Sequence, residues 1–352
     1  MDILALLKDW TGSFGPSGNE GEAARAIADA FAAYCRIETD ALQNVIATMG
    51  EGNPRVMITA HTDEIAMIST VVEDDGAIRF ARVNGIDPRT LPGARVWVHA
   101  EADGVREPLL GVVGALPPHL LQADKQGKNY PMDEMYIDVG LSAEAARDKV
   151  APGTLITLDG EPLQLKNNRI ACKTLDDRAG IVVMLRAAEI LSERKFKGQV
   201  SFVAASQEEM SGGGAETAAY KVNPDCALAI DMTLGKGHAQ DSDDTFPLDT
   251  VVAAIGPYIH RKLNQYLLDT AQEEHVSIQK EYASRSTSTN ADDIQISREG
   301  IPVALLSVPT LYMHTPVEVA ALDTLEEAAR LVAAFVAGLS RKEEGWLCDW
   351  ND

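Results

Sequence analysis

The second half of the chain alternates between short apolar runs and longer helical stretches, and this pattern most constrains the fold. From Lys166 onward, the apolar runs are typical of buried strands, and the sequence between them has helical periodicity. Such alternation indicates a mostly parallel sheet flanked by helices, with sites beyond the carboxyl ends of its strands. We expect strands at 200–205, 227–230 and 303–308, and helices at 177–194, 214–221, 263–275 and 324–339.

The middle of the chain, from Ile68 to Leu165, has a different texture. Short β-like segments are separated by Gly and Pro turns, and 143–149 is the main helical stretch. Short strands at this spacing predict a small barrel or sandwich. We therefore expect one larger domain made of 1–67 and 166–352, with 68–165 inserted as a β domain. The expected short strands are 68–73, 77–83, 95–98, 111–114, 135–139 and 154–158.

The N-terminal part is expected to form a helix followed by a strand. Ser17, with Glu20 three residues later, matches a capping box, and Ala-rich helical sequence continues through Phe31 to Tyr34. Residues 55–60 form a nearly continuous apolar run, which is typical of a buried strand.

The charge of the chain excludes several classes of partner. It carries 31 Lys and Arg against 53 Asp and Glu, a formal net charge of −22. Nucleic acids and anionic membrane surfaces attract the opposite sign, so we expect neither as a partner. We see no apolar run near the roughly 18 residues of a membrane span, no signal peptide, and no C-x-x-C pair among the four cysteines. These features predict a cytoplasmic protein.

Polar clusters stand where an expected strand ends or the first long helix begins. His61 and Asp63 follow a strand, and residues at i and i+2 share one face of a strand, although a surface coincidence explains the pair as well. Asp176 and Asp177 stand at the beginning of a long helix. Helix capping is the alternative interpretation, and it accounts for one acid better than for two.

Three further clusters follow other strands. Glu208 and Glu209 precede a glycine run, for which the alternative is a solvated turn. Asp231 ends an apolar strand, where an acid can simply face water. His314 lies just beyond the last expected strand, and the alternative there is an ordinary loop histidine.

Together these clusters place carboxylates and two imidazoles at the strand ends of one sheet. This donor set suits a pair of divalent ions such as Zn²⁺, Co²⁺ or Mn²⁺. Two ions roughly 3.5–4 Å apart need a bridging carboxylate, for which an aspartate at a rigid helix start is a candidate, and their charge acidifies a bound water. Glu208, beside the candidate ligand Glu209, can act as general base.

Five motifs at these positions resemble one known family. They are Ala60-His61-Thr62-Asp63-Glu64, Leu175-Asp176-Asp177-Arg178-Ala179-Gly180, Gln207-Glu208-Glu209, Ile230-Asp231-Met232-Thr233 and Tyr312-Met313-His314-Thr315-Pro316-Val317-Glu318. In this order they are similar to the co-catalytic metal aminopeptidases of the TET type, the glutamyl-aminopeptidase/CelM-like metallopeptidases. The resemblance covers essentially the whole chain. It implies a zinc-exopeptidase-like α/β fold and removal of N-terminal residues from short peptides.

The resemblance also implies which residues bind the metals. His61 and Asp231 would bind one ion, and Glu209 and His314 would bind the other. Asp176 would bridge the two ions. The ions would be Zn²⁺ or Co²⁺, with Mn²⁺ as a further candidate.

Other residues take implied roles in the reaction. Glu208 would be the general base for attack by a metal-bridging water, and then the acid that protonates the leaving amine. Asp63 would hydrogen-bond His61 and orient it. Asp177 would follow Asp176 through a cis peptide bond.

The resemblance implies an assembly as well. The inserted β domain would support dimers that assemble into a hollow tetrahedral dodecamer, and this shell would admit only short peptides.

Three departures from the family pattern leave the substrate class open. Leu311 stands where the family usually has Arg, and Asn290 lies in a stretch that usually reads Gly-Gly-Thr-Asp-Ala. Gly212, Gly213 and Gly214 replace part of a Val-Gly-x-x-Gly-Ala pattern. The alternatives are an amide deacylase or a carboxypeptidase-like enzyme with the same metals. A further alternative is a non-catalytic assembly protein that keeps the site for folding.

Overall fold

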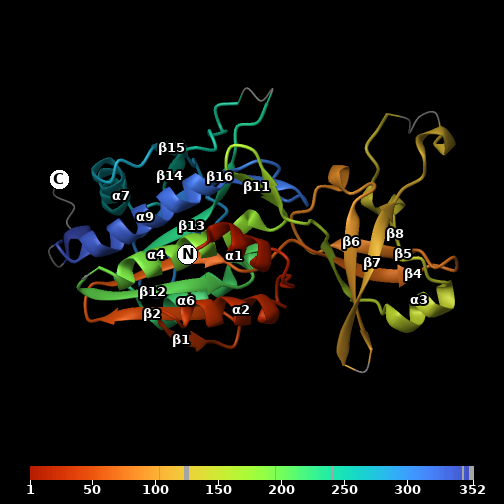
Figure 1. The fold of residues 1–352 in the computed structure, drawn as a ribbon, viewed down its shortest axis with the longest axis horizontal. Helices are drawn as coiled ribbons and strands as arrows, with labels where there is room; N and C mark the ends of the chain where they lie inside the picture. The colour runs from red at the N-terminus through yellow and green to blue at the C-terminus, as the bar shows by residue number, and fades with distance from the viewer. Residues whose placement is uncertain (103, 123–126, 195, 239–241, 343–344, 349–352) are drawn as a thin grey trace. The chain divides into compact units, whose positions relative to one another are not determined.

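The chain forms two compact units (Figure 1). The computed structural model describes residues 1–102, 104–122, 127–194, 196–238, 242–342 and 345–348. The first unit contains Met1–Glu64, Pro162–Met313 and Glu318–Asp352, and the second contains Ile65–Glu161 and His314–Val317. Within the described residues, no helix combines the length and apolar character needed to cross a membrane.

The first unit is built on an eight-stranded mixed sheet, as the α/β pattern predicts. Its central strands β12, β3, β13 and β16 are parallel, and antiparallel pairs lie toward both edges. In spatial order the strands are β1 (Arg36–Thr39), β2 (Val45–Glu51), β12 (Gly198–Ala205), β3 (Arg55–His61), β13 (Cys226–Leu234), β16 (Val303–Thr310), β14 (Val251–Ile255) and β15 (Ile278–Tyr282).

Helices cover both faces of this sheet because its strands are apolar on both sides. In β3, Val56 and Ile58 belong to one core cluster and Met57 to another, which is the period of two of a strand. The first core includes α1 (Ile3–Trp10), α2 (Gly21–Phe31), α4 (Leu175–Ser192), α7 (Arg261–Glu273) and α9 (Leu322–Leu339). The second includes α6 (Gly213–Val222) and α8 (Asn290–Ile294).

Helix α4 is more deeply buried than its sequence pattern suggests. The expected apolar face, which includes Ile181 and Leu185, is buried, but so are the intervening residues Val182 and Val183. The helix packs against β3 and β13 on one side and against α9 and α1 on others. A helix surrounded by such neighbours exposes little surface to solvent, and in α4 that surface lies toward its C-terminal part, at Arg186, Glu189, Ile190 and Ser192.

The capping box expected at Ser17 is wrong, although the helix after it is present. Helix α2 begins at Gly21, and its N-cap Glu20 makes no side-chain capping bond. Ser17 instead donates its hydroxyl to the carboxylate of Asp63 at 2.5 Å. A charged acceptor makes a stronger hydrogen bond than a neutral one, which favours this long-range contact.

A small antiparallel sheet completes the first unit. It consists of β10 (Leu163–Leu165), β11 (Arg169–Cys172) and β17 (Glu318–Ala321). Strand β11 leads into the segment that begins α4, and β17 brings Glu318 beside Cys172.

The second unit is a closed barrel, which decides between the barrel and the sandwich. Its strands follow the order β4 (Met67–Val72), β5 (Ile78–Arg82), β8 (Tyr136–Asp138), β7 (Val105–Gly114), β6 (Arg95–Ala102) and β9 (Leu155–Leu158). Ile78, Val98, Ile137 and Ile156 are fully buried in its core. Helix α3 (Ala143–Lys149), which packs against β4 and β6, has the predicted bounds.

The depth of the first core predicts the cost of truncating it. Leu331 of α9 is 0% exposed, whereas Leu163 of β10 is 53% exposed. We expect Leu331→Ala to lower the free energy of unfolding of the first unit by about 2–5 kcal/mol, because it removes apolar contacts and leaves a cavity. Leu163→Ala is the matched control and should change it by less than about 0.5 kcal/mol. Urea unfolding measures both values, and equal losses would contradict the assignment of this core.

Candidate metal centre

Two neighbouring parallel strands bring His61 and Asp231 to the same edge of the sheet. His61 is the last residue of β3, and it pairs with Ala205, the last residue of β12. Asp231 lies in β13 two residues beyond Ala229, which pairs with Thr59 of β3. Because these strands run in the same direction, their carboxyl ends present both side chains together.

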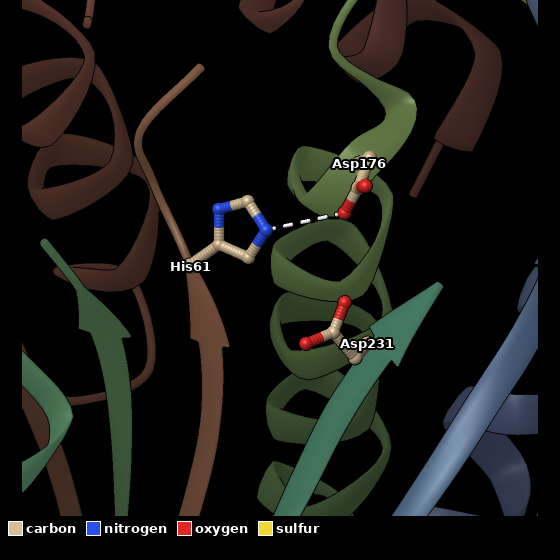
Figure 2. Close-up of side chains that lie close together, drawn as sticks. All are labelled: His61, Asp176 and Asp231. Atoms are coloured by element: carbon tan, nitrogen blue, oxygen red, sulfur yellow. Dashed lines mark hydrogen bonds and ion pairs between the residues drawn. The ribbon is translucent and has the colours of Figure 1, made fainter. Parts of the chain in front are cut away.

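Asp176 reaches this edge from the start of α4. The backbone of Asp176 is not helical there (φ −79°, ψ 105°), and the Asp176–Asp177 peptide bond is cis, as the family resemblance implied. The Nε2 atom of His61 lies 3.1 Å from Oδ1 of Asp176. One candidate ligand atom from each of His61, Asp176 and Asp231 lies within 4.8 Å of the other two (Figure 2).

Burial shifts the pKa values of the ionisable side chains in this cluster. Burial, together with the charges of Glu208 and Asp177, raises the pKa of Asp231 well above its usual range. Burial alone lowers the pKa of His61, but hydrogen bonds with Asp176 and Asp63 outweigh it, and the pKa lies well above its ordinary value. Carboxylates removed from water thus attract a proton to the imidazole, and a divalent cation can take the place of that proton.

The donor set at this edge fits a divalent metal ion. Oδ2 of Asp231 is buried and has no hydrogen-bond partner among the described residues. A buried carboxylate oxygen without a donor is costly, and a cation would remove that cost. Imidazole and carboxylate ligands together suit Zn²⁺, Co²⁺ and Mn²⁺.

Asp63 contacts His61 and also the segment that carries the two glutamates. Its Oδ1 atom is 3.4 Å from Nδ1 of His61, and its backbone carbonyl oxygen is closer to that nitrogen, at 3.1 Å. The same carboxylate accepts hydrogen bonds from the backbone N–H groups of Glu208 at 3.0 Å and Glu209 at 3.1 Å. Asp63 therefore joins the end of β3 to the turn after β12.

Glu208 and Glu209 begin the short helix α5 (Glu208–Ser211) at that turn. An oxygen of the Glu208 carboxylate lies 3.9 Å from Nε2 of His61. Burial raises the pKa of Glu208 to about 8, and neighbouring carboxylates, Glu209 first among them, add to the increase. A carboxylate oxygen of Glu209 lies within 4.8 Å of one of Asp176.

His314 belongs to the short segment His314–Val317, which is part of the second unit. In that unit its Nδ1 atom lies 2.9 Å from the carbonyl oxygen of Gly85. Its role as a ligand beside Glu209 stays a prediction.

Two of the three departures noted in the sequence, Leu311 and the glycine run, have structural reasons, whereas nothing in the structure explains Asn290. Leu311 packs in an apolar cluster with Leu248 and Val319, where a cationic side chain would be buried without its water. Gly212 has a positive φ of 64°, and a Cβ there would overlap the carboxylate of Asp293. A Cβ at Gly214 would overlap the backbone of Ser206, so α6 begins in close contact with the turn.

Sequence reasoning missed residues that hold the centre in place. Glu318, the buried first residue of β17, accepts a hydrogen bond from the backbone N–H of Asp176 at 3.1 Å. Glu64 is buried and paired with Lys173, and a guanidinium nitrogen of Arg178 lies 3.8 Å from it. The sequence offered one signal for these residues. Each lies in the same motif as a candidate ligand or its neighbour; they are Glu64, Arg178 and Glu318.

Known proteins resemble the chain in sequence and in structure. Residues 43–331 match the M42 glutamyl aminopeptidase family. The lysyl aminopeptidase of Pyrococcus furiosus is 33% identical over 308 residues, which cover 86% of this chain and 87% of that protein.

Two solved structures extend the similarity to the fold. Aminopeptidase APDkam598 from the archaeon Desulfurococcus kamchatkensis is 31% identical, with a TM-score of 0.89 over 98% of this chain and 96% of its own. The TET1 peptidase of Pyrococcus horikoshii is 28% identical, with a TM-score of 0.82 over 95% of this chain and 99% of its own. This chain belongs to the M42 glutamyl aminopeptidase family.

Proposed function

We propose that this M42 aminopeptidase is metal-dependent and removes N-terminal residues from short peptides, with Glu208 as its general base. The observation that carries the proposal is the convergence of His61, Asp176 and Asp231, with the Glu208 carboxylate 3.9 Å from the imidazole of His61. Metal-assisted hydrolysis requires metal ligands and a further carboxylate that is not a ligand, and here these groups lie at one edge of the sheet.

The proposed ligands divide between two ions. His61 and Asp231 would hold one ion, Glu209 and His314 would hold the second, and the carboxylate of Asp176 would be shared by both. When bound, Zn²⁺, Co²⁺ or Mn²⁺ would polarise the peptide carbonyl and lower the pKa of water. The proximity of Asp176 both to His61 and to Glu209 supports the bridging role.

Glu208 moves the proton in this proposal. Its carboxylate accepts a proton from the attacking water and then donates it to the amine of the departing peptide. Burial raises the pKa of Glu208 to about 8, and cations at the adjacent ligands would lower that pKa and favour the ionised base. The backbone of Glu208 is held by Asp63, which keeps the carboxylate near His61.

The substrate is recognised by its free amino terminus. Acidic side chains around the centre favour a cationic amine over a blocked one. The family carries the description glutamyl, whereas the Pyrococcus furiosus relative is a lysyl aminopeptidase. Preference for the first residue therefore varies within the family, and side chains other than the ligands set it.

The proposal extends to assembly and location. The domain 68–165 supports oligomerisation, as a dimer that assembles into a dodecamer and limits entry to short peptides. The TET1 peptidase of Pyrococcus horikoshii can assemble into a tetrahedron or a large octahedral shell. The enzyme would act in the cytoplasm, where cysteines stay reduced, and Cys35, Cys172, Cys226 and Cys348 are free thiols.

Metal binding should stabilise the first unit. We expect Zn²⁺, Co²⁺ or Mn²⁺ at about 100 times the dissociation constant to add about 2.7 kcal/mol to its stability, since the ion binds only the folded ligands. Thermal unfolding with and without metal measures this shift. Asp231→Asn should lose most of it, because one ligand charge is removed. An equal shift in wild type and variant would contradict the role of Asp231.

Glu208→Gln should lower kcat on unblocked peptides by about 10²–10⁴-fold, because an amide cannot accept the proton. Metal content, measured by elemental analysis, should stay at the wild-type value. N-acetylated peptides serve as the substrate control and should not be cleaved. Full activity in Glu208→Gln would refute the base assignment, and cleavage of blocked peptides would favour a deacylase.

The purified protein should have a mass near twelve times that of one chain. The expected reason is self-association through the barrel unit, as proposed above. Mass photometry or light scattering measures this mass. A monomer that hydrolyses short peptides at full rate would show that assembly is not needed for the reaction.

A further inference from the structure

The loop before α2, residues 15–20, lies beside the strand end that carries His61. Pro16 forms a parallel bridge with Glu64, and the N–H of Glu64 donates to the carbonyl of Gly15 at 3.0 Å. The N–H of Gly15 donates in turn to the Glu64 carboxylate at 3.2 Å. The loop lies before residues 43–331, the part of the chain that matches the family model.

A buried cation fixes the chain just before this loop. The guanidinium of Arg178 is 0% exposed and donates to the carbonyl oxygens of Trp10, Ser13 and Thr62. Arg178, a residue of α4, therefore connects residues 10–13, which come just before the loop, to the segment after His61. The loop is thus anchored in two ways, by its own backbone hydrogen bonds with Glu64 and by the contacts of Arg178 with the residues before it.

Ser17 extends from the loop to Asp63. Its hydroxyl donates to Oδ2 of Asp63 at 2.5 Å. The same oxygen accepts the N–H of Glu209, and Oδ1 accepts the N–H of Glu208. Ser17 therefore fixes the orientation of the carboxylate that holds both glutamates.

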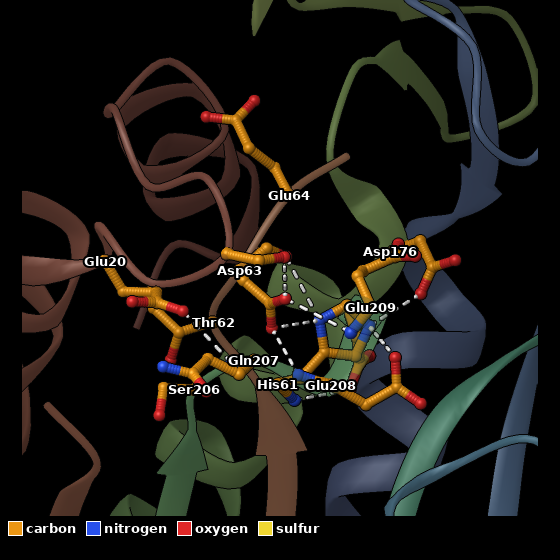
Figure 3. A network of polar contacts seen from close by, with 12 residues as sticks. Glu20, His61, Thr62, Asp63, Glu64, Asp176, Ser206, Gln207, Glu208 and Glu209 are labelled. Carbon is orange, nitrogen blue, oxygen red and sulfur yellow. Dashed lines mark hydrogen bonds and ion pairs between the residues drawn. The ribbon is translucent and has the colours of Figure 1, made fainter. Parts of the chain in front are cut away.

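Glu20 holds Gln207, the residue before the two glutamates. Its Oε1 atom accepts the N–H of Gly18 at 2.7 Å and the N–H of Gln207 at 3.0 Å. Gln207 has a left-handed backbone, with φ of 58°, at the point where the chain leaves β12. The carboxylates of Glu20 and Asp63 thus hold three successive N–H groups of the turn 207–209 (Figure 3).

The local helix does not explain why Glu20 is buried. Its side chain makes no capping bond to α2, yet the residue is 0% exposed. Its Oε2 atom has no hydrogen-bond partner in the part of the chain that the structure describes. Burial, which outweighs the hydrogen bond from Gly18, raises the pKa of Glu20 to about 7. The hydrogen bonds that its carboxylate does make come from the N–H groups of Gly18 and Gln207.

We propose that Glu20 and Ser17 are positioning residues, which hold the turn 207–209 and thereby place the Glu208 carboxylate beside His61. The catalytic consequence rests on the proposed function, whereas the hydrogen-bonded turn is a property of the fold. Glu20 acts through its acceptor oxygen, so a glutamine at this position should serve nearly as well as the glutamate.

Hydrogen exchange in the full-length protein tests the turn without reference to catalysis. In Glu20→Ala, the amides of 207–209 should exchange at least about tenfold faster, because Gln207 loses its acceptor. In Glu20→Gln, they should exchange nearly as in the wild type. Asn19→Ala changes an exposed residue of the same loop and should leave these amides unaffected. Unchanged exchange in Glu20→Ala would overturn the proposal.

Steady-state kinetics of the metal-loaded enzyme test the consequence. Glu20→Ala should lower kcat on an unblocked dipeptide by about 10- to 100-fold with KM within about twofold, since a displaced base affects the chemical step. Glu20→Gln should restore kcat to within about threefold of wild type. A Glu20→Gln enzyme as slow as Glu20→Ala would overturn the acceptor role, and normal kcat with a loosened turn would overturn the positioning role.

Ser17→Ala is the second variant if Glu20→Ala does not fold. It removes one donor from Asp63, so the amides of Glu208 and Glu209 should exchange several-fold faster and kcat should fall several-fold. Unchanged exchange and kcat would overturn the proposal. Full activity of Glu208→Gln alongside a loosened turn in the Ser17 or Glu20 variants would instead refute the proposed base and leave the held turn standing.

Discussion

Carboxylates removed from water at the carboxyl edge of the sheet are the constraint on which the rest of the centre depends. Asp176, Asp231 and Glu208 lie close together at that edge, and burial raises the pKa of both Asp231 and Glu208. Such a group must find donors, a counter-charge or a proton. Around the centre, neighbouring groups supply such donors and counter-charges, whereas Oδ2 of Asp231 has no donor among the described residues.

Neighbouring carboxylates are compensated in different ways, and the difference separates binding from support. Glu64 is paired with Lys173 and Arg178, so burial is offset and its pKa is lowered. Asp63 is satisfied by N–H and hydroxyl donors. Oδ2 of Asp231 has no such partner among the described residues, which suits a ligand. The supporting acids therefore hold backbone segments, while Asp231 keeps its Oδ2 atom for the proposed metal.

Much of the fold follows from hydrophobic periodicity, and the exceptions are instructive. The bounds expected for α3 agree with the structure, and β3 and β16 were placed within two residues at each end. The edge strand β1 was not predicted, because it is polar and largely exposed. Its antiparallel neighbour β2 was also not predicted, although it begins with buried apolar residues. The capping box failed because Ser17 and Glu20 have a local pattern typical of a helix start but bond to residues far along the chain.

The sequence by itself determined the alternation of strands and helices, the inserted β segment and the types of donor placed at strand ends, since these depend on periodicity and side-chain chemistry. Only the tertiary structure decided which donors meet. The register of β3 against β13 brings His61 and Asp231 together, and the non-helical start of α4 brings Asp176 to them. Ser17, Glu20 and Glu318 join the centre through contacts between distant segments. Such contacts depend on packing, which no local pattern encodes.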